Sequence, residues 1–258
     1  MSSYSHRYSI TAADMDNQYR LTHGAVLLYY QDCWARMMSC SHLAAFDVIK
    51  QRKIWVITEF HCHFSPETAL WSEDIDLEVW NSELTPLRVY SDFRLKCHGA
   101  VVAQGYGCWN LLNADSKRIE RCDGLPDMPE SIGEMTLGEH RKIRFDEGGE
   151  LVRSVEHRVN NLDLDFNGHV NNRSYLGIAM LTAPEEFLRN NSLEQMHIQW
   201  VRETFLGDTI TCELRRSAGG QTYTHLLYKG GHECVAKIAS LWLPKTRVAD
   251  VSEILVRS

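Results

Sequence analysis

The chain has 258 residues, of which 44% are hydrophobic and 24% charged, a balance that is ordinary for a folded, soluble protein. Its formal net charge of −7 argues against a general nucleic-acid binder, because such proteins usually present a basic surface. Its longest apolar runs, such as residues 25–30, are far shorter than the ~20 residues that cross a bilayer, so no membrane span is expected.

The start of the chain shows neither the apolar core of a signal peptide nor the Arg-rich pattern of a transit peptide. The eight cysteines are scattered and include no Cys-x-x-Cys pair. We therefore expect reduced thiols, most of them buried.

The first strongly predicted element is a helix. Apolar side chains recur there every three to four residues, at Val26, Tyr30, Trp34 and Met37. This spacing gives one wide apolar stripe along the helix, and such a stripe normally packs into a core.

The chain then shows an internal repeat with alternating strands. The stretch "HCHFSPETALWSEDIDLEV" from His61 resembles "HIQWVRETFLGDTITCEL" from His197. Alternation of apolar and polar residues over 74–80 and 209–214 predicts antiparallel sheets with one face on a core. Each half is therefore expected to contain one helix followed by several antiparallel strands, which is an α+β fold.

A polar and charged stretch that carries Pro126 and Pro129 separates the two halves. Such composition is typical of a linker that follows the surface. We predict an N-terminal domain over residues 1–125, a linker over 126–150 and a C-terminal domain over 151–258.

The segment "LDLDFNGHVNNRSYL" from Leu162 places Asp165, Asn167 and His169 at alternate positions ahead of a second predicted helix. In an extended segment this spacing would direct three functional side chains to one side. Turn residues followed by a helix N-cap explain the loop but not the histidine. On these residues alone, a capped loop is the commoner interpretation, and Glu203 would be a surface strand residue.

Four segments, in order, resemble the double-hotdog acyl-ACP thioesterase family. "IWVITEFHCHF" from Ile54 and "CWNLLNADSKRIER" from Cys108 are similar to the family's IWVVTR and VWxMMNxxTRR segments. "LDLDFNGHVNNRSYLG" resembles DLDxNxHVNNxxYxxW, from which Gly177 departs, and "WVRETFLGD" from Trp200 resembles YRREC. The resemblance implies two tandem hotdog units, each a long helix cradled by an antiparallel sheet. The first would shape the substrate pocket and the second would be catalytic.

The resemblance also implies a catalytic set, which comprises Asp165, Asn167, His169 and Glu203. Thr204 stands where plant members carry Cys, so a Cys-His-Asn mechanism cannot operate through that position. We expect water to attack the thioester, with Glu203 and His169 acting together as the acid–base groups that transfer its proton. Asn167 would hydrogen-bond the water or substrate, and Asp165 would fix the array. Backbone N–H groups after His169, at a helix N-terminus, are the expected oxyanion hole.

By the same resemblance, Trp34, Met37 and Met38 of the first helix would line the acyl tunnel, and Thr204 would be a further substrate-binding residue. Glu67, the repeat partner of Glu203, has no Asp-x-Asn-x-His companion in its own half. The first half is therefore expected not to catalyse.

No metal and no cofactor are expected. His61 and His63 alternate on one predicted strand, but no third ligand is evident from the sequence.

The predicted function is hydrolysis of medium- to long-chain acyl-ACP to free fatty acid and ACP in fatty acid biosynthesis. The alternatives are an acyl-CoA thioesterase and, from a different class, a non-catalytic acyl-binding hotdog protein. A hotdog dehydratase fits the motifs less well.

The expected partner is acyl carrier protein with its acyl chain, with no nucleic acid and no membrane involved. Because ACP is acidic, docking requires a basic patch, for which Arg173, Arg202, Arg215 and Arg216 are candidates. The plastid transit peptide of the plant enzymes is absent, which indicates a bacterial, cytoplasmic member. The sequence leaves open the acyl chain length and whether the chain forms a homodimer.

Overall fold

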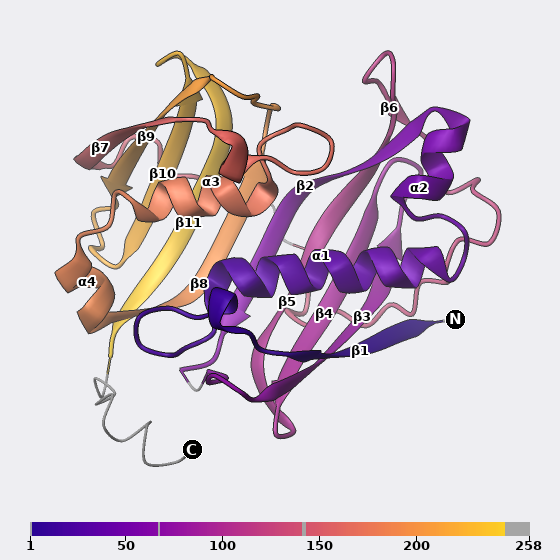
Figure 1. Ribbon diagram of the computed structural model, residues 1–258, viewed down its shortest axis with the longest axis horizontal. Coiled ribbons are helices and arrows are strands. Elements are labelled where there is room, and N and C mark those ends of the chain that lie inside the picture. Colours follow the sequence, from indigo (N-terminus) through magenta and orange to yellow (C-terminus); the bar gives the residue numbers. More distant parts are fainter. Residues whose placement is uncertain (1, 67, 141–142, 246–258) are drawn as a thin grey trace. The chain divides into compact units, whose positions relative to one another are not determined.

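The computed structural model describes residues 2–66, 68–140 and 143–245, which form two compact units (Figure 1). Unit 1 ends at Arg141 and unit 2 begins at Lys142. This division falls within residues 126–150, the predicted linker. The domain boundaries given above remain predictions.

Unit 1 contains an antiparallel sheet with the strand order β1-β3-β4-β5-β2, and β6 pairs with β5. On β3 the buried Ile75, Leu77 and Val79 alternate with more exposed acidic residues, which is the predicted period of two. The strands are β1 (Ser3–Ser9), β2 (Lys53–Phe64), β3 (Asp74–Leu84), β4 (Val89–Cys97), β5 (Ala100–Asn113) and β6 (Ile119–Glu120).

Helix α1 (His23–Ser39) packs on one face of this sheet (Figure 1). It begins after the N-cap Thr22, whose hydroxyl accepts a hydrogen bond from the N–H of Ala25 at 3.2 Å. The predicted apolar stripe is confirmed, since its members are buried: Val26, Tyr30, Trp34 and Met37. The shorter helices of unit 1 are η1 (Ala12–Asp14), α2 (Ala45–Val48) and η2 (Ile49–Gln51).

Tyr30 shows how closely α1 approaches the sheet. Its hydroxyl donates to the carbonyl of Ser91 at 3.2 Å and accepts from the indole N–H of Trp109 at 2.9 Å. A Cβ atom at Gly107 would lie 2.3 Å from that hydroxyl, so a larger residue there would displace the Tyr30 ring. Trp34, one turn further along α1, stacks on Trp109 with ring centroids 3.8 Å apart.

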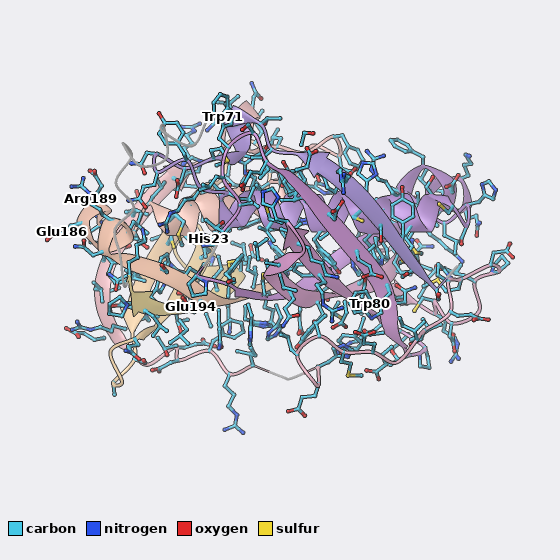
Figure 2. All side chains as sticks on the ribbon, turned by 90° about the horizontal axis from the view of Figure 1, so that it is seen from below. His23, Trp71, Trp80, Glu186, Arg189 and Glu194 are labelled. Atoms are coloured by element: carbon cyan, nitrogen blue, oxygen red, sulfur yellow. The ribbon has the colours of Figure 1, made fainter. Side chains whose placement is uncertain are left out.

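Residues 129–140, which we call the strap, cover the other face of β3 and β4. Phe93 contacts Tyr30 on the α1 side, so the next side chain, Asp92, points to the opposite face. There the carboxylate of Asp92 accepts from the N–H of Thr136 at 2.7 Å. The indole N–H of Trp80 (Figure 2) donates to the carbonyl of Glu134 at 2.8 Å. Much of the predicted linker therefore packs on unit 1.

Unit 2 has a second antiparallel sheet, with the order β8-β11-β10-β9-β7. Helix α3 (Asn172–Met180) packs on this sheet and is capped by Asn171, whose side chain accepts from the N–H of Arg173. The remaining elements are β7 (Glu150–Arg158), η3 (Asn161–Asp163), α4 (Glu185–Asn190), β8 (Asn191–Trp200), β9 (Thr209–Arg216), β10 (Thr222–Lys229) and β11 (Glu233–Pro244).

Each unit is thus an antiparallel sheet with few helices, as the sequence predicts. The prediction that each half starts with its helix is wrong, because β1 precedes α1 and β7 precedes α3. Both strands lie at the end of their strand order, and none of their residues is buried. Neither carries the apolar run that identifies a buried strand.

The cysteine prediction is confirmed, since all eight thiols are free and six of them are buried. Across the described residues, no helix has the length and apolar character needed to cross a membrane.

Candidate active site

Asp165, Asn167 and His169 lie in a tight turn between η3 and α3. The N–H of Gly168 donates to the carbonyl of Asp165 at 3.1 Å, and Gly168 has a φ of +78°, a conformation that glycine adopts without strain. The N–H of Asp165 in turn donates to the carbonyl of His169 at 2.8 Å. The expectation of an extended segment is therefore wrong, because the chain reverses direction between the three side chains.

Asp165 organises this turn. Its Oδ1 accepts from the N–H groups of Asn167 at 2.8 Å and His169 at 3.2 Å. Its Oδ2 lies 3.5 Å from the side-chain nitrogen of Asn167. A carboxylate that bonds the backbone two and four residues ahead holds the turn in shape, so Asp165 orients His169 through the main chain.

His169 and Glu203 come together across the turn and the segment that follows β8. The Nδ1 of His169 lies 3.6 Å from Oε1 of Glu203. The N–H of Val170 donates to the carbonyl of Thr204 at 2.9 Å, which holds the two segments side by side. Both side chains are partly exposed, His169 by 26% and Glu203 by 38%, so water and substrate can reach them. A neighbouring imidazole and carboxylate can take a proton from an attacking water near pH 7.

The surface around this pair is apolar. The ring of Phe205 stands edge-on to the His169 imidazole, with centroids 5.1 Å apart. Phe166 and Leu206, each three residues from a member of the pair in sequence, are also exposed. Exposed apolar groups beside a polar pair suit a substrate with both an apolar and a reactive part.

Thr204 is fully buried, and its hydroxyl lies 2.7 Å from the hydroxyl of Tyr175 on α3. Burial raises the pKa of Tyr175 to about 12, so that hydroxyl stays protonated. The pair ties α3 to the segment that carries Glu203. The sequence analysis did not identify Tyr175, although it occupies the tyrosine position of the DLDxNxHVNNxxYxxW pattern. Substrate binding by Thr204 stays a prediction.

Four of the backbone N–H groups that follow His169 donate hydrogen bonds within the chain: those of Val170, Asn171, Arg173 and Ser174. The N–H of Asn171, for example, donates to the carbonyl of Asp163 at 2.7 Å. For these four groups the prediction of free oxyanion donors is wrong. Asp163 was not identified from the sequence, and its carboxylate also lies 2.8 Å from Nε2 of His157.

Unit 1 contains the same turn with different side chains. Oδ1 of Asp16 accepts from the N–H groups of Gln18 at 2.7 Å and Arg20 at 3.0 Å, as Asp165 does in unit 2. Arg20 therefore stands where His169 stands. The sequence signal was present in "DMDNQYRLTH" but is obscured, because the side chains that identify the motif are replaced.

The backbone contact that places Glu203 is also repeated in unit 1. The N–H of Leu21 donates to the carbonyl of Ala69 at 3.0 Å, which is equivalent to the bond that ends on the carbonyl of Thr204. Thr68 therefore occupies the position of Glu203, and the turn of unit 1 lacks the imidazole–carboxylate pair.

The predicted tunnel residues Trp34, Met37 and Met38 are buried in the core of unit 1, beneath α1. Their role in binding an acyl chain stays a prediction. Glu67, which the sequence repeat pairs with Glu203, lies outside the described residues.

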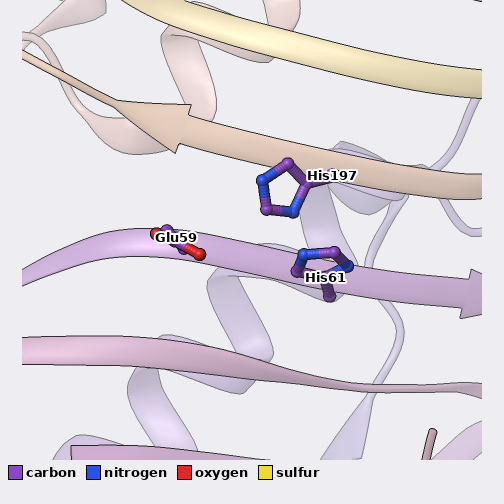
Figure 3. A group of neighbouring side chains, drawn as sticks. All are labelled: Glu59, His61 and His197. Carbon is purple, nitrogen blue, oxygen red and sulfur yellow. The ribbon is translucent and has the colours of Figure 1, made fainter. Parts of the chain in front are cut away.

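His61 is explained by packing. It lies on β2 with Glu59 (Figure 3), is 5% exposed, and stacks on Tyr106 with ring centroids 4.5 Å apart. His63 lies two residues further along the same strand. That the protein needs no metal and no cofactor stays a prediction.

A second histidine–carboxylate cluster, which the sequence analysis missed, lies beneath the strap in unit 1. His140 places Nδ1 3.0 Å from Oε2 of Glu83 and Nε2 3.0 Å from Oδ2 of Asp92. Its side chain is 5% exposed, and Asp92 is fully buried. Burial alone would lower the pKa of His140, but its bonds to Asp92 and Glu83 outweigh burial and raise it. The imidazole therefore links the end of the strap to Glu83 and Asp92 of the sheet.

Residues 150–244 match the family model described as the acyl-ACP thioesterase C-terminal domain. This range includes the turn of unit 2, α3 and Glu203.

Curated relatives extend the similarity to more of the chain. A chloroplastic acyl-[acyl-carrier-protein] hydrolase from Cuphea viscosissima is 23% identical over 210 residues, which cover 76% of this chain and 49% of the relative. A chloroplastic oleoyl-acyl carrier protein thioesterase from Arabidopsis thaliana is 24% identical over 175 residues, 62% of this chain and 47% of the relative. The chain thus spans about half the length of these relatives.

Two solved structures share the fold at low identity. An acyl-ACP thioesterase from Bacteroides thetaiotaomicron superposes with a TM-score of 0.83 at 16% identity, covering 93% of this chain and 98% of that one. A 12:0-ACP thioesterase from Umbellularia californica gives a TM-score of 0.80 at 16% identity, with coverages of 94% and 98%. Together, these comparisons confirm the resemblance to the acyl-ACP thioesterase family that the four motifs predicted.

Proposed function

We propose that this chain is a thioesterase that hydrolyses medium- to long-chain acyl-ACP to free fatty acid and ACP, as a step in fatty acid biosynthesis. The observation that carries the proposal is the His169–Glu203 pair, which is 3.6 Å apart, accessible, and bordered by exposed apolar side chains. The pair lies within the segment that matches the thioesterase family model, and the named relatives act on acyl-ACP.

In the proposed reaction, a water oxygen attacks the thioester carbonyl carbon while Glu203, assisted by His169, takes the water proton. The C–S bond then breaks, and the thiol leaves with that proton. A thioester tetrahedral intermediate carries negative charge on oxygen, which needs a donor. Since four N–H groups around the start of α3 are engaged, we assign this role to the exposed side-chain amide of Asn167, which has one N–H near Asp165 and a second for the substrate.

We further propose that the two units are tandem hotdog units, the first over residues 1–125 and the second over 151–258. Each unit has a helix on an antiparallel sheet, and the fold likeness to known thioesterases supports this interpretation. Unit 1 would shape the acyl pocket, with Trp34, Met37 and Met38 along it. The lack of an imidazole–carboxylate pair in the turn of unit 1 supports a non-catalytic role.

We propose a cytoplasmic location, with acyl carrier protein as the partner and without nucleic acid or membrane. A homodimer is compatible with the proposal but is not required by it.

One observation favours acyl-CoA as a second candidate substrate. Three of the four arginines considered for docking an acidic carrier are already paired with glutamates, namely Arg202 with Glu233, Arg215 with Glu213 and Arg216 with Glu150. Such pairing reduces the positive potential that would attract ACP. Arg173, exposed on α3, is then the main candidate for a carrier contact.

A hydrolysis panel tests the proposal, with acyl-ACP and acyl-CoA of several chain lengths at low and high salt. We expect acyl-ACP to be the better substrate, its hydrolysis to slow as salt rises, and Arg173→Glu to raise KM for acyl-ACP alone. Equal, salt-insensitive rates with both carriers would favour the acyl-CoA alternative. Binding without hydrolysis would make the protein an acyl-binding module. Quenched single-turnover samples should show no acyl adduct on the protein by mass spectrometry.

A further inference from the structure

The turn that joins β4 to β5 in unit 1 brings a thiol, an imidazole and a carboxylate together. Nε2 of His98 lies 3.0 Å from Oε1 of Glu73, and Sγ of Cys97 lies 3.4 Å from Oε2 of the same carboxylate. One ligand atom from each of the three residues lies within 4.8 Å of the other two. Zinc accepts all three groups, and its bonds of about 2.0–2.3 Å place tetrahedral ligand atoms roughly 3.3–3.6 Å apart. The spacing of the cluster is therefore close to that of a zinc site.

Strand pairing brings the carboxylate to the turn. Ile75 of β3 pairs with Cys97 of β4, and the same antiparallel register sets Glu73, two residues before Ile75, opposite the turn. The N–H of Leu70 donates to Oε2 of Glu73 at 2.7 Å and so orients the carboxylate. Ligating carboxylates in metal sites are commonly held by such a hydrogen bond.

The turn itself directs the imidazole toward Glu73. Cys97 pairs with Ala100, so His98 and Gly99 are the two turn residues, and their φ values are +49° and +82°. Two-residue hairpin turns with two positive φ angles usually carry Asn, Asp or Gly at the first position. The backbone therefore does not require a histidine there, and Asn is a substitution that the turn accepts.

We propose that Cys97, His98 and Glu73 bind one Zn²⁺ ion, with a water molecule as the fourth ligand. The thiol of Cys97 gives up its proton to solvent and binds as the thiolate. His98 binds through the lone pair of Nε2, with the ring proton on Nδ1. The thiolate and the carboxylate together carry two negative charges, which balance the charge of the ion. A thiolate and an imidazole favour zinc over magnesium or calcium, which prefer oxygen ligands.

Access to the cluster is graded. Cys97 is 6% exposed, whereas the side chains of Glu73 and His98 are exposed by 28% and 76%. The ion can therefore enter from the His98 side, while the thiolate holds it at the protected end. A bound ion would tie the segment before β3 to the turn between β4 and β5.

The proposal departs from the sequence prediction that no metal is bound. Glu73 lies 24 residues before Cys97, so no short ligand spacing marks the cluster in the sequence. The hydrolysis written above for His169 and Glu203 requires no metal, and the inference does not depend on the proposed function.

Cobalt(II) tests the proposal, because a thiolate bound to cobalt gives a charge-transfer absorption band in the near ultraviolet. The full chain is treated with a chelator, dialysed, and titrated first with CoCl₂ and then with ZnCl₂. We expect a band that saturates at one cobalt per chain and disappears when zinc replaces cobalt. Absence of the band would overturn the proposal, and so would a band that zinc does not displace.

Matched variants assign the band to the cluster. His98→Asn removes one ligand but suits the turn, so it should weaken the binding of cobalt and zinc at least tenfold. His42→Asn, at an exposed position of unit 1 with a φ of +55°, should bind both metals as the unsubstituted chain does. Cys97→Ser should abolish the band, whereas Cys40→Ser, which removes an exposed thiol, should keep it.

A band that survives Cys97→Ser would overturn the proposal, as would equal metal affinities in the two histidine variants. If Cys97→Ser does not fold, the comparison of His98→Asn with His42→Asn decides the matter alone.

Discussion

Units 1 and 2 each contain a turn shaped by an aspartate, yet they place their histidine–carboxylate groups differently. Asp16 and Asp165 make equivalent bonds to the backbone. In unit 2 the turn presents His169 to Glu203 at a distance of 3.6 Å, and both are accessible. In unit 1 the buried histidine His140, at the end of the strap, has both ring nitrogens within 3.0 Å of a carboxylate, whereas His98 forms an exposed pair with Glu73 outside the Asp16 turn. The aspartate therefore specifies the turn, while accessibility and an unsaturated imidazole distinguish a reactive histidine from a structural one.

The largest expected effect is on the buried cluster. At a pH below the raised pKa of His140, His140→Ala removes the cation beside the fully buried Asp92, and removing one partner of a buried ion pair typically costs about 3–5 kcal/mol of unfolding free energy. Denaturant unfolding measures this loss. His169→Ala, at the exposed pair, should change the unfolding free energy by less than about 1 kcal/mol. Similar losses in both variants would remove the distinction between the two histidines.

The proposed thioesterase activity should respond in the opposite way to the unfolding free energy, with the larger loss in the His169 variant. His169→Ala and Glu203→Ala should each lower kcat/KM for the thioester about a hundredfold or more, because a positioned acid–base group is lost. The matched change in the turn of unit 1, Arg20→Ala, should leave kcat/KM within about twofold. Steady-state kinetics on folded variants provide the measurement. An active His169→Ala enzyme, or an Arg20→Ala enzyme as impaired as it, would contradict the assignment of chemistry to unit 2.

The free energy of unfolding should depend on pH in part through the protonation of His140. Because the pKa of His140 is raised on folding, its stabilising contribution is complete below the unfolded value near 6.5 and is lost as pH rises through the folded value. Unfolding free energies measured from pH 6 upward should therefore fall more steeply for the unsubstituted protein than for His140→Ala. Parallel curves would show that the imidazole carries no extra proton in the folded state.

Substitution of the two aspartates should separate effects on stability from effects on catalysis. Asp16→Ala and Asp165→Ala each remove two hydrogen bonds from a turn, and each should cost about 1–2 kcal/mol of stability. Asp165→Ala should also reduce kcat, since His169 loses its orientation, whereas Asp16→Ala should not. Thermal unfolding and kinetics on the same samples test both statements. Loss of kcat in both variants would point to a shared catalytic role for the turns.

The smallest effect is expected at Thr204. Thr204→Ala and Tyr175→Phe each break the same 2.7 Å contact, so each should cost about 1 kcal/mol of stability and retain most of the activity. A double variant should then be no worse than the sum of the two. An inactive but folded Thr204→Ala enzyme, or an acyl ester on Thr204 during turnover, would show that the hydroxyl rather than water attacks.

Local pattern alone predicted a good part of this protein. The spacing of Val26, Tyr30, Trp34 and Met37 predicted α1, and alternation predicted strands, because helices and strands impose fixed periods on whichever face they bury. The four motifs predicted the resemblance to the acyl-ACP thioesterase family. The edge strands β1 and β7 were missed because neither has a buried residue, so neither carries an apolar run.

Only the tertiary structure decided which polar groups meet. The 3.6 Å approach of His169 and Glu203 depends on a backbone bond between Val170 and Thr204, which no local period encodes. The turn of unit 1 could not be recognised, because backbone bonds can persist when the side chains that mark a motif are replaced. His140 acquired its partners from strands distant in sequence, and the N–H groups of Val170 and Asn171 donate to carbonyls of other segments. Contacts of this kind follow from packing and strand register across the whole unit, and a sequence specifies these only through the folded chain.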